Sequence, residues 1–167
     1  HTRWATHGPA IEANAHPHRS EHVAIVHNGI IENYRDLKQQ PAADGAEFTS
    51  DTDTEVIAHL FSQKLKAKDD VMAAAAATFA ALEGAYAIAL IVEGLEDRMF
   101  IARNGSPLAI GYGRGEMFIG SDAFALAPFT NRIAYLDDGD WAVISGTGAE
   151  IFAADGSGVT RAQVVVD

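Results

Sequence analysis

Residues 83–120 read EGAYAIALIVEGLEDRMFIARNGSPLAIGYGRGEMFIG, and this stretch carries the strongest secondary-structure signal in the chain. Short apolar runs alternate in it with clusters of Gly, Asp, Asn and Ser, a spacing typical of β-hairpins. The runs predict strands at Tyr86–Val92, Met99–Ala102, Leu108–Tyr112 and Met117–Ile119. Three later runs predict strands at Ile133–Leu136, Trp141–Ile144 and Ile151–Phe152.

Two helices are predicted immediately before these strands. Apolar residues recur with a helical period at Val56, Ile57, Leu60 and Phe61. Thr52 with Glu55 three residues later fits a capping box, so we expect a helix over about 53–66. A second helix over about 69–82 contains the alanine run 73–77 and stops near Gly84. Two helices followed by a mostly antiparallel sheet predict an α+β fold.

A further strand and helix are expected upstream. His22–His27, HVAIVH, is rich in β-branched residues and predicts a strand. The dipeptide Asn28-Gly29 predicts that this strand ends in a sharp turn, since both residues tolerate positive φ. Residues 30–40 have apolar side chains at helical spacing, and Pro41 is expected to stop that helix.

Composition narrows the function classes. The chain has 167 residues, of which 48% are hydrophobic and 21% charged, as expected of one domain or one incomplete domain. Twelve basic against 23 acidic residues give a net charge of −11, which disfavours nucleic-acid binding. The absence of cysteine excludes a disulfide framework, a thiolate metal site and a cysteine nucleophile within these residues.

Location and completeness are also expectations from the sequence. No apolar run reaches the roughly 18 residues of a membrane span, and no basic-plus-apolar leader is present in these residues. We therefore expect a cytoplasmic globular protein with no membrane partner. The first residue is His1 rather than Met, so we expect a fragment, a processed product or a trimmed chain.

Polar residues near the amino terminus suggest a site for a small zwitterion. The guanidinium of Arg3 suits a carboxylate, although a surface salt bridge is the alternative. Asn28 and Gly29 offer an amide and a backbone N–H as a pair of oxyanion donors, or simply a turn. Asp53 either holds an ammonium group or caps a helix with Asp51, and spacing alone favours capping.

Histidines gather in the same region without a recognised metal-ligand spacing. His16, His18 and His22 lie close together in sequence, and neutral imidazoles are common metal ligands. The spacing does not follow H-E-x-x-H or a similar motif. A hydrogen-bonded loop is therefore the favoured interpretation, and no metal or other cofactor is predicted.

Seven motifs in family order resemble the glutaminase domain of the glucosamine-6-phosphate synthases, or glutamine–fructose-6-phosphate aminotransferases (isomerising), from the first residue to about 150. The combination of the first three motifs is highly specific. Other class II amidotransferases, such as the phosphoribosylpyrophosphate amidotransferases, share the fold but differ in the first motif. The motifs are HTRWATHG (1–8), NAHPH (14–18), VHNGIIENY (26–34), SDTDTEVIAHL (50–60), EGAYAI (83–88), ARNGSPLAIG (102–111) and IGSDAFAL (119–126).

The resemblance implies an N-terminal-nucleophile hydrolase fold, a four-layer α/β/β/α sandwich of antiparallel sheets that is incomplete here at its amino-terminal end. It implies that residues 1–167 are one partial glutaminase domain and that glutamine is the substrate. The implied site residues are Arg3 for the glutamine α-carboxylate, Thr6 and His7 in the same pocket, Asn28 and Gly29 as the oxyanion hole, Asp53 for the α-amino group and Trp4 as the gate of the ammonia path.

The family nucleophile, an amino-terminal cysteine whose α-amino group is the general base, is absent from this sequence. The resemblance therefore implies that these residues alone are inactive. It also implies a sugar-phosphate isomerase domain in the same parent chain and a possible homodimer. Three alternatives stay open: the glutaminase domain of another class II amidotransferase, a non-catalytic amino-acid-binding module, and a histidine metal-binding domain.

Overall fold

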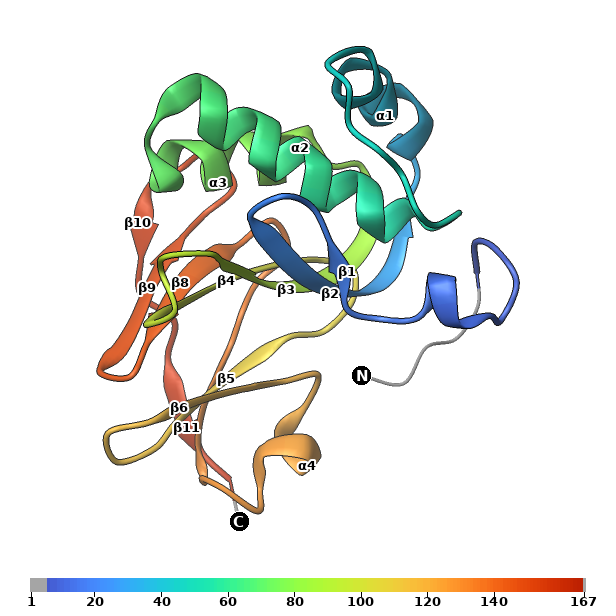
Figure 1. The fold of residues 1–167 in the computed structure, drawn as a ribbon. Helices are drawn as coiled ribbons and strands as arrows, with labels where there is room; N and C mark the ends of the chain where they lie inside the picture. The colour runs from blue at the N-terminus through green and yellow to red at the C-terminus, as the bar shows by residue number, and fades with distance from the viewer. Residues whose placement is uncertain (1–5, 167) are drawn as a thin grey trace.

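Two antiparallel sheets form the framework of the computed structural model, which describes residues 6–166 (Figure 1). The larger sheet has seven strands in the order β1-β2-β3-β4-β8-β9-β10. These are β1 (His18–Arg19), β2 (Val23–Ile31), β3 (Gly84–Val92), β4 (Arg98–Asn104), β8 (Trp141–Ser145), β9 (Gly148–Phe152) and β10 (Gly158–Val159). The smaller sheet has four strands in the order β11-β7-β5-β6. These are β11 (Gln163–Val165), β7 (Arg132–Tyr135), β5 (Ala109–Tyr112) and β6 (Met117–Gly120).

Three α-helices lie over one face of the larger sheet (Figure 1). They are α1 (Tyr34–Ala43), α2 (Asp53–Lys68) and α3 (Val71–Ala81). Alternate residues of β2 and β3 point toward them, and the main core forms between the two layers. Phe61 of α2 meets Phe100 of β4 in this core, with ring centroids 5.9 Å apart. The core therefore fixes α2 firmly against the sheet that carries Asn28 and Gly29.

The smaller sheet packs against the opposite face of the larger one (Figure 1). Ile101 and Ile144 of the larger sheet meet Ile110 and neighbouring residues of the smaller sheet in a second core. The short helix α4 (Ala123–Leu126) covers the outer face of the smaller sheet through Leu126. The layers are thus α/β/β. Within residues 6–166, the short helix α4 is the helix that lies on the outer face of the smaller sheet, where the fourth layer is expected.

The predicted α+β class and all seven predicted strands of residues 83–152 are confirmed, but the predicted turn at Asn28-Gly29 is wrong. β2 runs on through both residues to Ile31, which pairs with Gly84. Gly29 has φ +115°, and a Cβ there would lie 2.0 Å from the carbonyl oxygen of Ala85. Gly84 has φ +122°, and its Cβ would lie 2.2 Å from the carbonyl oxygen of Ile30. Two glycines on facing strands thus allow the close approach that continues the sheet.

The helix predicted over residues 30–40 is displaced. Ile30 and Ile31 belong to β2, and α1 begins at Tyr34 and continues through Pro41 to Ala43. Proline removes one backbone donor, and the helix continues for only two residues after it. The helix predicted over about 53–66 is confirmed as α2, and the one over about 69–82 is confirmed as α3. Within residues 6–166, none of the helices combines the length and apolarity that crossing a bilayer requires.

Candidate functional site

The start of α2 is the point where several motifs meet. Thr52 is the N-cap, and its hydroxyl accepts a hydrogen bond from the N–H of Glu55 at 3.4 Å. The Glu55 carboxylate turns to the preceding loop, where it accepts from the N–H groups of Thr49 and Ser50 at 2.8 and 2.7 Å. The predicted cap at Thr52 is therefore confirmed, while the glutamate holds the loop instead of closing the second half of a capping box.

The surroundings of Glu55 predict that the folded protein is sensitive to acid. Burial acts to raise the pKa of this carboxyl, but hydrogen bonds from Ser50 and Thr49 outweigh it and hold the pKa below the usual 4.5. A carboxyl with a lowered pKa in the folded state stabilises the fold above its unfolded-state pKa, and this contribution is lost as the pH falls through the folded-state pKa. We expect the melting temperature to fall more steeply below pH 4.5 in the natural protein than in Glu55→Gln. If the melting temperatures of the two proteins fall by the same amount between pH 7 and pH 3, this expectation is wrong.

Asp53, the first residue of α2, is buried and joins that helix to the end of β2. Its Oδ2 accepts a hydrogen bond from the backbone N–H of Ile31 at 2.8 Å. Its Oδ1 lies 3.8 Å from Nδ1 of His7. The capping interpretation favoured by spacing is wrong for Asp53, because Thr52 occupies the N-cap. The carboxylate instead faces the loop that contains His7.

Asn28 and Gly29 lie on the part of β2 that extends beyond β1. β1 pairs with Ala24 and Ile25 and ends there. The N–H of Ile31 points away from β3, toward Asp53. Strand alternation directs the N–H of Gly29 to the same edge and places the exposed side chain of Asn28 on the face opposite His27. One short strand segment therefore presents backbone donors at the edge next to the buried carboxylate and the Asn28 amide on the opposite face.

The described part of the first motif lies beside the starts of α1 and α2. The ring of His7 meets the ring of Tyr34 edge-on at 4.9 Å, and the side chain of Thr6 is exposed. Buried Asn14 donates from Nδ2 to the carbonyl oxygen of Pro9 at 3.0 Å and accepts from the N–H of Asp51 at 3.0 Å. Asn14 therefore ties the motif loop to the residues before α2. Arg3 and Trp4, two of the predicted site residues, lie outside the described residues.

Three histidines of this region are hydrogen-bonded to threonines at the start of α2. Nδ1 of His27 lies 2.9 Å from the hydroxyl of Thr54, and Nε2 of His16 lies 3.3 Å from the same oxygen. Nε2 of His18 lies 3.2 Å from the hydroxyl of Thr52. Of the three histidines in the predicted loop, His16 and His18 are thus hydrogen-bonded here, whereas Nδ1 of His22 lies 3.0 Å from Oε2 of Glu93. Across residues 6–166, no group of three or more His, Cys, Asp or Glu side chains has an arrangement suited to a metal ion.

Sequence reasoning missed three of the residues that build this site: Asn14, His27 and Thr54. Each is buried and bonded to a residue at least 27 positions away, so local spacing carried no signal for the contact. The only available signal was composition. Residues 52–54 all carry a hydroxyl or a carboxylate, and a helix cap uses only one such side chain, so the others were available for contacts elsewhere.

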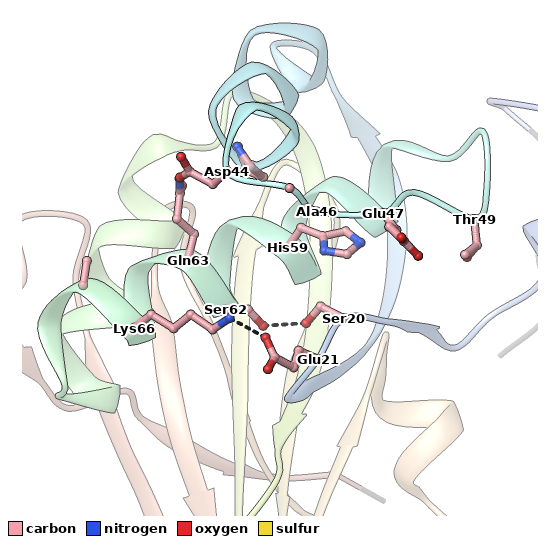
Figure 2. A pocket seen from close by; sticks show the side chains of 13 residues that line it. Ser20, Glu21, Asp44, Ala46, Glu47, Thr49, His59, Ser62, Gln63 and Lys66 are labelled. Atoms are coloured by element: carbon pink, nitrogen blue, oxygen red, sulfur yellow. Dashed lines mark hydrogen bonds and ion pairs between the residues drawn. The ribbon is translucent and has the colours of Figure 1, made fainter.

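A separate groove of about 800 Å³ lies on the outer side of α2 (Figure 2). The 44–49 loop and the β1–β2 connection form its other walls. Several of its polar side chains pair with one another: Ser20 with Ser62 at 2.6 Å, Lys66 with Glu21, and Gln63 with Asp44. None of Asn28, Gly29 and Asp53 lines this groove, so it is distinct from the strand-edge site.

Solved structures with the same architecture define the class. A glutamine phosphoribosylpyrophosphate amidotransferase from B. subtilis, complexed with ADP and GMP, superposes with a TM-score of 0.75 and 28% identity, over 92% of this chain and 34% of that one. A glutamine aminotransferase class-II domain protein from Silicibacter pomeroyi gives a TM-score of 0.57 at 19% identity, over 84% of this chain and 70% of its own, and shows the fold alone. The protein is a class II amidotransferase-type domain with the N-terminal-nucleophile hydrolase fold.

The sequence comparisons then give the family. Residues 1–128 match the family model described as a glutamine amidotransferase domain, and the chain belongs to that family. A glutamine–fructose-6-phosphate aminotransferase [isomerizing] from Rhizobium meliloti (strain 1021) is 56% identical over 99% of this chain and 27% of its own length. Its namesake from Mesorhizobium japonicum is 56% identical over 96% of this chain and 26% of its own length. The chain spans about a quarter of the length of these relatives.

Proposed function

We propose that residues 1–167 are the glutamine-binding part of a glutaminase domain that hydrolyses glutamine to glutamate and ammonia. One observation carries this proposal: the hydrogen bond from the N–H of Ile31 to Asp53 places a buried carboxylate beside the strand segment that carries Asn28 and Gly29. Glutamine carries an ammonium group and a reacting carbonyl a few bonds apart. A site for it therefore needs a carboxylate acceptor close to hydrogen-bond donors.

Each end of glutamine has a proposed partner. Asp53 accepts the α-ammonium, and Arg3 binds the α-carboxylate through its planar guanidinium. Thr6 and His7 line the same pocket, supported by the position of His7 beside Asp53. Asn28 and Gly29 donate to the amide oxygen, and Trp4 gates the path by which ammonia leaves. These assignments follow the family resemblance of the motifs and the geometry of the described residues.

The chemistry requires a nucleophile that residues 1–167 do not contain. In the family, a cysteine thiolate of the parent chain attacks the side-chain amide carbon, and the carbonyl oxygen becomes an oxyanion held by Asn28 Nδ2 and the N–H of Gly29. Collapse of this intermediate breaks the C–N bond, the nitrogen takes up a proton, and ammonia leaves. Water then hydrolyses the glutamyl thioester to glutamate and restores the thiol.

The acceptor of the ammonia is the second part of the proposal. Two relatives that are 56% identical bear the name glutamine–fructose-6-phosphate aminotransferase [isomerizing], which supports fructose 6-phosphate as acceptor and glucosamine 6-phosphate as product. The parent then carries a sugar-phosphate isomerase domain, works in the cytoplasm and forms a homodimer. The second candidate is phosphoribosylpyrophosphate as acceptor, which the 28% identical solved structure favours.

An acceptor assay on the purified full-length parent tests both candidates. With glutamine as nitrogen donor, we expect glucosamine 6-phosphate from fructose 6-phosphate and no phosphoribosylamine from phosphoribosylpyrophosphate. A polypeptide of residues 1–167 alone, which has no cysteine, serves as control and should release no ammonia above background. Transfer to phosphoribosylpyrophosphate alone would replace the first candidate with the second, and no glutamine hydrolysis by the full-length parent would reject the glutaminase function.

A further inference from the structure

The two halves of the proposed glutamine site lie on different elements. Asn28 and Gly29 belong to β2, whereas Asp53 belongs to α2. Glutamine spans them, so the relative position of strand and helix decides whether both ends of the substrate engage at once. The Ile31–Asp53 hydrogen bond joins the elements directly but uses one of the carboxylate oxygens that bind substrate.

A second connection joins the same two elements without using a substrate-binding group. His27 immediately precedes Asn28, and Thr54 immediately follows Asp53. Nδ1 of His27 and the hydroxyl of Thr54 are 2.9 Å apart, and the residues are 3% and 2% exposed. A short bond in so buried a place leaves little freedom for the strand to slide relative to the helix.

The Thr54 hydroxyl also reaches a third segment. Nε2 of His16 lies 3.3 Å from it, so the hydroxyl can donate to one imidazole nitrogen and accept from the other. His16 itself meets the ring of His18, whose Nε2 is bonded to Thr52. Thr54, the residue after Asp53, therefore links the 14–18 motif to β2.

We propose that the hydrogen bond between His27 and Thr54 is a positioning contact that holds the oxyanion donors and the ammonium-binding carboxylate in register for one glutamine molecule. This inference rests on the proposed function and adds two residues to its machinery. His27 and Thr54 act through Asn28 and Asp53 respectively. Small misplacements of reacting groups have large kinetic effects, so the loss of this contact affects both kcat and KM.

The electrostatics of His27 agree with this role. Burial lowers the pKa of its imidazole to about 4, while the charge of Asp53 acts in the opposite direction and His7 and His18 lower it further. The ring is therefore neutral at the pH of ordinary assays. Its contact with Thr54 is a hydrogen bond between uncharged groups, and it is not expected to change over that range.

The test compares three threonine variants in the full-length parent. Thr54→Val keeps the shape of the side chain and removes the hydroxyl, and Thr54→Ser keeps the hydroxyl. Thr78→Val is the matched control, because Thr78 is buried and its hydroxyl has no hydrogen-bond partner among residues 6–166. We expect Thr54→Val to lower kcat/KM for glutamine by tenfold or more, with changes in both kcat and KM, while Thr54→Ser and Thr78→Val stay within about threefold of the parent.

The outcomes separate the inference from the function it rests on. If the parent with Thr54→Val hydrolyses glutamine with the same kcat/KM as the parent with Thr78→Val, the positioning role is overturned. The glutaminase function would then remain intact. No hydrolysis by the unaltered parent would reject the function itself. If Thr54→Val does not fold, His27→Asn and His27→Leu replace it, since Asn keeps a polar group near the Nδ1 position. Equal kcat/KM values for that pair would also overturn the proposal.

Discussion

Replacing Asn28 with alanine in the full-length parent should lower kcat for glutamine hydrolysis by about 10²- to 10³-fold and leave KM nearly unchanged. In the proposed role, the lost amide acts on the tetrahedral intermediate more than on bound glutamine, and one oxyanion donor typically contributes that much. The side chain is exposed at the strand edge, so its removal should cost little stability. Steady-state kinetics with glutamine, combined with thermal melting, measure both quantities.

Asn131→Ala is the control for this experiment. Asn131 is also exposed, but it precedes β7 in the smaller sheet, and its replacement should leave kcat unchanged. Synthesis with externally supplied ammonia should continue in both variants if the acceptor domain uses free ammonia. A kcat for Asn28→Ala within about threefold of the parent would show that Asn28 is not an oxyanion donor.

Replacing Asp53 with asparagine should weaken the use of glutamine by about 30-fold or more in kcat/KM. The change removes the negative charge that we propose faces the α-ammonium, and leaving one member of a buried charge pair without its partner costs on the order of 2–5 kcal/mol. Asparagine still accepts a hydrogen bond from the N–H of Ile31, and Thr52 still caps the helix. The variant therefore isolates the charge from the structural roles of this position.

Asp51→Asn provides a matched control two residues away. Asp51 is exposed, and its contact with Asn14 is made by its backbone N–H, so the change should alter neither stability nor kcat/KM. Asp53→Asn with a glutamine-dependent rate within about twofold of the parent would reject the binding role. Equal losses in the two variants would point to the net charge of the region and not to a contact with substrate.

Much of the fold was predictable because it depends on local patterns. Short apolar runs between turn residues identified β3 and β4, and period-3.6 residues with a threonine cap identified α2. The edge strands β1 and β10 have two residues each, too few to show a period. The continuation of β2 through Gly29 depends on Gly84, a partner far away in sequence that no local pattern reveals.

For the candidate site, side-chain types suggested a chemistry, but the sequence did not show how the residues come together. A carboxylate at Asp53 and donors at Asn28 and Gly29 suggested a zwitterion from side-chain types alone. The sequence indicated the cap at Thr52 but could not show that the Asp53 carboxylate would accept a hydrogen bond from the N–H of Ile31 in β2. It also could not show the His27–Thr54 contact, because helix packing against a sheet decides which distant side chains meet.

The pairing of β2 with β3 has a consequence for how the protein folds. Val23 pairs with Val92 and Ile31 with Gly84, so three helices lie within the loop that this strand pair closes. Closing such a loop costs chain entropy before its contacts form, and folds built on distant pairings form slowly. We therefore expect the strand edge that carries Asn28 and Gly29 to become competent late in refolding, after α2 and α3 gain helical structure. The entropic cost of closing a loop grows slowly with loop length, by about 0.6 kcal/mol for each doubling. Insertions into the 44–50 loop should therefore delay this step only modestly.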